Sequence, residues 1–71
     1  MTTSNLQLIA SSGGSVIVSA TNYTTSNLQL IANSGKAKGA NLLIKDANKL
    51  TTSNCQLIAS ANPGHVYFDF T

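Results

Sequence analysis

TTSNLQLIA occupies Thr2–Ala10 and returns unchanged at Thr24–Ala32. A third copy, TTSNCQLIA, occupies Thr51–Ala59, where Cys55 replaces the leucine of the first two copies. The copies start 22 and 27 residues apart. Self-similarity at a period of 20 to 50 residues is typical of folds built from stacked or pseudo-symmetric units. The chain is therefore predicted to form one domain made of three repeats, 2–23, 24–50 and 51–71.

Each copy of this constant segment is followed by a turn that contains glycine and then by a variable apolar segment. The variable segments are Val16–Asn22, Leu42–Asn48 and Val66–Thr71. Apolar and polar residues alternate in both kinds of segment, and a period of two is typical of β-strands. Each repeat is thus predicted to be a strand, a turn and a second strand. A short helical turn within residues 40–50 is the one weak exception.

The alternation also predicts which residues face the core. In the constant segment it places Leu6, Leu8 and Ala10 on one face. In the variable segments Ile17, Leu43 and Tyr67 point away from the core. Helix is disfavoured because β-branched, Asn and Ser residues dominate the chain. The predicted core positions of the variable segments are Val16, Val18, Leu42, Ile44, Val66, Phe68 and Phe70.

The predicted fold class is all-β, with six strands, and two architectures fit it. Strand–turn–strand units stacked in parallel would form a β-solenoid or an intertwined β-oligomer. Three hairpins would form a six-stranded pseudo-threefold barrel or prism. The near-identity of the constant segments favours parallel stacking, because ladders of like amides stabilise cross-β structure. One predicted ladder holds Asn5, Asn27 and Asn54, and the other holds Gln7, Gln29 and Gln56.

Composition restricts the partners. Charged residues make up 8% of the chain and the net charge is +2, whereas about 25% charged residues is usual. There is no arginine, the residue best suited to phosphate, so no nucleic-acid partner is expected. No apolar run approaches the ~20 residues of a membrane span. No signal peptide follows Met1, so we expect a cytoplasmic protein, or one that is particle-associated or extracellular by a non-Sec route.

Residues that carry chemistry are scarce. His65 is the only histidine, Cys55 the only cysteine, and there are two aspartates and no glutamate. One cysteine cannot form an intrachain disulfide. One cysteine and one histidine cannot supply the four ligands of a structural zinc site, and a general acid/base pair of carboxylates has little to draw on. We expect no enzyme activity, no metal and no cofactor.

The low charge and the few residues that would block strand pairing favour a non-enzymatic, self-assembling structural β-repeat protein, such as a fibre, shaft or spike component. Its expected partners are copies of itself. An alternative is a small multivalent lectin that binds glycans at three equivalent sites. A third hypothesis is an amyloid-like protein, because segments 28–32 and 66–70 are apolar and nearly uncharged. The candidate residues of the lectin alternative are Asn5, Gln7, Asn27, Gln29, Asn54 and Gln56.

Overall fold

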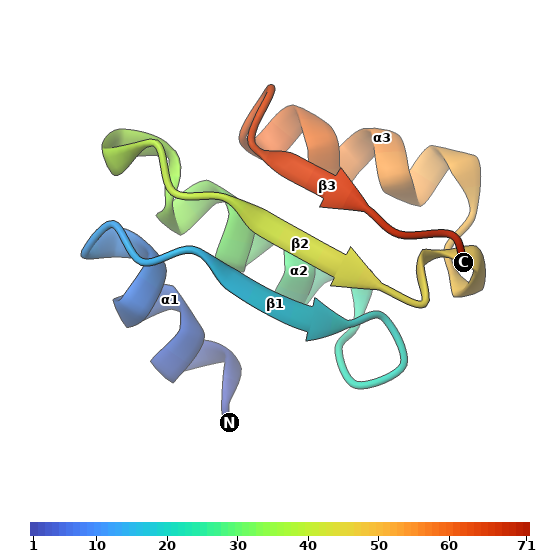
Figure 1. The fold of residues 1–71 in the computed structure, drawn as a ribbon, viewed down its shortest axis with the longest axis horizontal. Helices are drawn as coiled ribbons and strands as arrows, with labels where there is room; N and C mark the ends of the chain where they lie inside the picture. Colours follow the sequence, from blue (N-terminus) through green and yellow to red (C-terminus); the bar gives the residue numbers. More distant parts are fainter.

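A computed structural model describes residues 1–71, in which three α-helices alternate with three β-strands (Figure 1). Two short 3-10 turns, η1 (Lys36–Lys38) and η2 (Ala47–Lys49), flank the second strand. The strands form one parallel sheet in the order β1-β2-β3, and the helices cover one of its faces. No helix combines the length and the apolar character needed to cross a membrane. The main elements are α1 (Thr3–Ser11), β1 (Val16–Ser19), α2 (Thr25–Ser34), β2 (Leu42–Lys45), α3 (Thr52–Ala61) and β3 (Val66–Phe68).

The predicted all-β fold is wrong, because the constant segment forms a helix in all three copies. Neither the β-solenoid, the intertwined β-oligomer nor the six-stranded barrel or prism forms. Thr2, Thr24 and Thr51 are the helix N-caps, and each hydroxyl oxygen accepts a hydrogen bond from the backbone N–H three residues on, at 3.2 Å. Such a cap satisfies one of the four N–H groups that a helix start leaves without a partner. The polar Thr-Thr-Ser-Asn run therefore starts a helix.

The apolar residues of the constant segment follow the helical period. In α2, Leu28, Ile31 and Ala32 are all buried, and the spacing i, i+3, i+4 places them on one face of a helix. Leu30, which strand alternation would bury with Leu28, is 48% exposed. The predicted ladders of asparagines and of glutamines do not form, because these residues lie on separate helices.

The prediction of strands in the variable segments is confirmed for the first three or four residues of each segment. Parallel pairing aligns Leu42 with Val16 and with Val66. Val18, Leu42 and Ile44 are buried, as alternation predicts. Phe70 lies beyond β3 and is 58% exposed, so its predicted core position is wrong. The alternative of a helical turn within residues 40–50 corresponds to η2.

The core lies between the sheet and the three helices. Each third of the chain (2–23, 24–50 and 51–71) contributes one helix and one strand to these two layers. The opposite face of the sheet carries no helix (Figure 1). The buried core cluster consists of Leu6, Val18, Ala20, Leu28, Ile31, Ala32, Leu42, Ile44 and Ile58.

Candidate functional site

The helix α2 shows how each position of the constant segment behaves with neighbours on both sides. It packs against α1 on one flank and α3 on the other (Figure 1). Its Leu28, Ile31 and Ala32 are at most 1% exposed, whereas Leu30 is exposed. The outer helices α1 and α3 each have only one neighbouring helix. A side chain that is more exposed in an outer helix than at the equivalent position of α2 therefore marks a helix face that has no neighbouring helix.

At the α1 end the largest difference among the apolar side chains falls on one isoleucine. Ile9 is 37% exposed, whereas its equivalents Ile31 and Ile58 are 1% and 0% exposed. The helix α3 also has one neighbouring helix, yet it buries its isoleucine, so this position faces the preceding helix. Leu8 is 66% exposed, and its equivalents in α2 and α3 are exposed as well. Ile9 lies against Gly14 but is left without the further cover that its equivalents have.

At the α3 end the difference falls on other positions, two of which are buried in both α1 and α2. Leu6 and Leu28 are buried, but their equivalent Cys55 is only half-buried. Ala10 and Ala32 are likewise buried, whereas Ala59 is half-buried. These positions face the following helix. The two ends of the row of helices therefore leave complementary parts of the same helix–helix interface uncovered.

The contacts between α1 and α2 show what such an interface contains. The Gln7 Nε2 amide donates a hydrogen bond to Ser34 Oγ at 3.2 Å. Ala10 lies against Gly35, where an added Cβ would be 3.5 Å from the Ala10 Cβ and 2.9 Å from the Ala40 Cβ. The distance to Ala10 is an ordinary van der Waals contact, so it is Ala40, which follows η1, that leaves no room for a side chain at Gly35.

The two edge strands of the sheet, β1 and β3, lie at the same two ends of the molecule as the outer helices α1 and α3. Inside the sheet the Val16 N–H donates to the Asn41 carbonyl at 3.1 Å, and the Leu42 N–H donates to the His65 carbonyl at 2.8 Å. The outer edges of β1 and β3 pair with no other strand. Edge strands are usually protected by charge or proline. Neither β1, with the sequence VIVS, nor β3, with VYF, carries such a residue.

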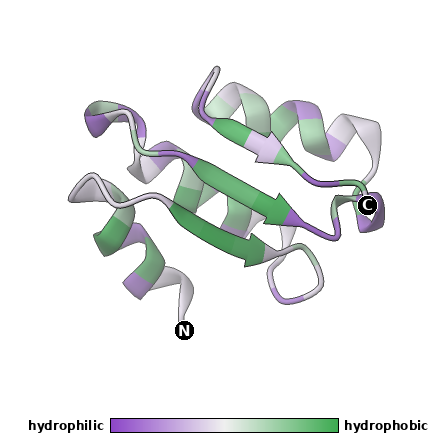
Figure 2. Cartoon of the chain, in the orientation of Figure 1, coloured by the Kyte–Doolittle hydropathy of each residue, from purple (hydrophilic) through white to green (hydrophobic).

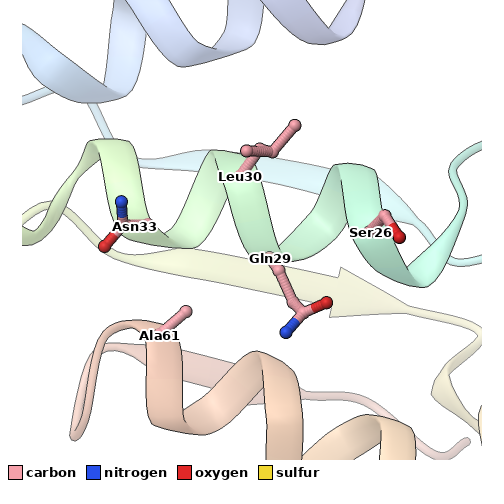
Figure 3. A pocket seen from close by; sticks show the side chains of 5 residues that line it. All are labelled: Ser26, Gln29, Leu30, Asn33 and Ala61. Carbon is pink, nitrogen blue, oxygen red and sulfur yellow. The ribbon is translucent and has the colours of Figure 1, made fainter.

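The asparagines of the lectin alternative lie in the first turns of the three helices, where their backbone N–H groups donate to the capping threonines. The three glutamines have different surroundings. Gln29 points toward α3 (Figure 3). Gln7 is hydrogen-bonded to Ser34, and Gln56 is exposed at the α3 end. Three equivalent glycan sites stay a prediction.

A groove of about 440 Å³ lies between α2 and α3. Ala61 occupies the position equivalent to Ser34, so Gln29 has no hydroxyl opposite it of the kind that Gln7 has (Figure 3). The groove between α2 and α3 therefore opens at the position that is equivalent to the Gln7–Ser34 hydrogen bond between α1 and α2. Its lining residues are Ser26, Gln29, Leu30, Asn33 and Ala61.

The helix-free face of the sheet carries three rows of side chains, one residue per strand in each row. The middle row is apolar and consists of Ile17, Leu43 and Tyr67, with Ile17 66% and Tyr67 51% exposed. Figure 2 shows β1 and most of β2 among the most hydrophobic parts of the chain. A hollow of about 240 Å³ opens beside this row. The first row is Ser15, Asn41 and His65, and the third is Ser19, Lys45 and Asp69.

The histidine and the charged residues of this face belong to its outer rows, and Asp46 borders the third row, where Ser19 Oγ donates a hydrogen bond to Asp46 Oδ2 at 2.6 Å. His65 Nδ1 lies 2.8 Å from Asn41 Oδ1. Hydrogen bonds from the hydroxyl and the backbone N–H of Thr71, with a smaller contribution from Lys45, hold the pKa of the exposed Asp69 carboxyl below its usual value. No group of three or more His, Cys, Asp or Glu side chains is arranged to hold a metal ion.

Sequence reasoning identified Ile17, Leu43 and Tyr67 as pointing away from the core, and the structure confirms that the sheet leaves this row uncovered. It missed the exposure of Ile9 at the α1 end and of Cys55 and Ala59 at the α3 end. The signal that would have found them is the alignment of the three constant segments at the helical period. The comparisons with known proteins found no matching family model, no matching curated protein and no matching solved structure.

Proposed function

We propose that this protein is a non-enzymatic structural protein that assembles end to end with copies of itself. In the proposed junction, the α3–β3 end of one copy packs against the α1–β1 end of the next. The observation that carries the proposal is the exposure of Ile9, 37%, against at most 1% at the equivalent Ile31 and Ile58. Such an assembly suits a fibre, shaft or spike component, and it is built from helix–strand pairs.

The helix contacts inside the chain indicate which residues would meet at the junction. At the junction, Gln56 of one copy corresponds to Gln7 and Ser12 of the next copy corresponds to Ser34. Gln56 would therefore donate a hydrogen bond to Ser12, as Gln7 donates to Ser34. Gly13 of the next copy, the residue equivalent to Gly35 in the sequence, would lie near Ala59, although its φ is +99° where that of Gly35 is −85°. Ile9 of the next copy would be covered by α3, since the equivalent Ile31 is buried in α2, which has α1 before it in the row of helices. Both ends thus supply the residue types that the internal interface uses.

The strand pairing continues in the same way. In the register of the sheet, Val66 of one copy would align with Val16 of the next. The Val66 N–H would then donate to the Ser15 carbonyl, as the Leu42 N–H donates to the carbonyl of His65. Each such bond contributes about 1 kcal/mol net.

Charge does not oppose the junction. Residues 2–23 contain no charged side chain, and residues 51–71 contain only Asp69. All four lysines lie between Lys36 and Lys49, in the middle third of the chain. Two joined ends therefore meet without like-charge repulsion between side chains. A contact between two different surfaces of the same chain produces an open filament, or a ring if the rotation per copy closes.

The experiment compares two aspartate substitutions one residue apart by sedimentation velocity over a concentration series. We expect the unmodified protein to form species far larger than 7.4 kDa as the concentration rises. Ile9→Asp would put a charge into the junction, so it should sediment as a 7.4 kDa monomer. Leu8→Asp is the matched control, because this position is exposed in all three helices.

Far-ultraviolet circular dichroism establishes that both variants keep their helices. Two results would overturn the proposal. One is an unmodified protein that remains a monomer from micromolar to millimolar concentration. The other is a folded Ile9→Asp variant that assembles as well as Leu8→Asp does.

A further inference from the structure

From the uncovered face of the sheet we infer a second interface, through which two end-to-end stacks pair face to face. This inference rests on the proposed function. The middle row of the face is apolar, and Ile17 and Tyr67 are more than half exposed. Parallel sheets are usually covered on both faces, whereas this sheet has helices on one face only (Figure 1). The occupant of the second face is a second copy of the same chain.

Charge complementarity selects the copy and its orientation. A two-fold axis parallel to the rows makes the strands of the two facing copies antiparallel. The first row of each copy then faces the third row of the other. His65 then faces Asp69 of the other copy, and Asn41 faces Lys45. If the facing strands run parallel, Lys45 faces its own equivalent, and like charges opposed in this way repel each other. The middle row faces itself in both cases, so the outer rows favour the antiparallel arrangement.

The size of the face explains why this pairing depends on stacking. The three strands lie about 4.8 Å apart, and the three rows together extend about 13 Å along the strands. The face of one copy therefore measures roughly 190 Å². A stable interface buries about 800 Å² on each partner, so a single pair of copies falls short by about fourfold. In a stack the row from Ile17 to Tyr67 continues from copy to copy. About four stacked copies would then present the required area.

The symmetry of the two interfaces is compatible. The two-fold axis lies along the direction in which copies stack, so both stacks run the same way and every copy has the same surroundings. Aligned sheets pack about 10 Å apart with their inner side chains interdigitated. The product is a pair of stacks with the helices on both outer faces and the apolar rows between them.

The test measures mass per unit length of assembled material by scanning transmission electron microscopy. In the unmodified protein, each length equal to the rise from one copy to the next should contain the mass of two copies. Leu43→Lys places a charge in the centre of the apolar row, so its stacks should show half that mass per length. Leu30→Lys, at an exposed position on α2, is the matched control and should keep the full value. Tyr67→Lys is a second variant at an exposed position, for use if Leu43→Lys does not fold.

The outcomes separate the two claims. Single-file stacks of the unmodified protein would overturn the paired interface and leave the end-to-end proposal standing. Folded Leu43→Lys or Tyr67→Lys stacks with full mass per length would do the same. Absence of any stack in the unmodified protein would overturn both claims. A two-copy particle that is stable without stacking would contradict the dependence on stacking argued from the area of the face.

Discussion

At the scale of single residues, a threonine hydroxyl decides where each helix begins. Thr24 accepts a hydrogen bond from the backbone N–H of Asn27 at 3.2 Å. Thr24→Ala removes this acceptor and should lower the free energy of unfolding by about 1 kcal/mol. Thr52→Ala is the control, because Thr52 is the first helical residue of α3 and the cap there is Thr51. Urea denaturation of both variants measures the difference, and equal stabilities would contradict the capping role.

The same residues show why the sequence misled on the constant segment. Within five residues, Leu6, Leu8 and Ala10 fit the period of a strand, whereas Leu6, Ile9 and Ala10 fit the period of a helix. Thr, Ser and Asn have low intrinsic helix propensity, and this favoured the strand. The capping position of the first threonine of each segment is the signal that would have decided for the helix.

At the scale of elements, the variable segments were predictable because their alternation of buried and exposed residues has only one reading. Val18 and Ile44 face the core, and Ile17 and Leu43 face away. The candidate site was harder to predict, since the exposure of Ile9 depends on its helix being the first in the row. The three constant segments have nearly the same sequence, so the sequence does not show that the first helix has no helix before it.

The groove between α2 and α3 gives a prediction for a pair of elements. Ala61→Ser restores a hydroxyl opposite Gln29, as Ser34 stands opposite Gln7. The new hydrogen bond should raise the free energy of unfolding by about 0.5 kcal/mol, since the net value of ~1 kcal/mol is reduced by the lower helix propensity of serine. Ser34→Ala is the reverse experiment and should lower stability by a similar amount. Thermal denaturation measures the stability of both variants. Shifts of the two stabilities in the same direction would contradict the proposed role of the hydroxyl.

At the scale of the whole molecule, the fold has a direction, because three parallel strands and three helices progress together from one open end to the other (Figure 1). A chain of this size buries only about 60% of its unfolded surface. Covering Ile9, Cys55 and the two strand edges would add buried surface without adding residues. Stability should therefore grow with assembly, since binding of a partner to the folded state stabilises that state.

The most direct measurement is the axial rise per copy in assembled material, determined by electron cryo-microscopy. Three strands spaced about 4.8 Å apart predict a rise of about 14 Å per copy. The sheet should run unbroken, with β3 of each copy beside β1 of the next. A sheet interrupted between copies, a rise that does not match three strand spacings, or single subunits at every concentration would contradict the account.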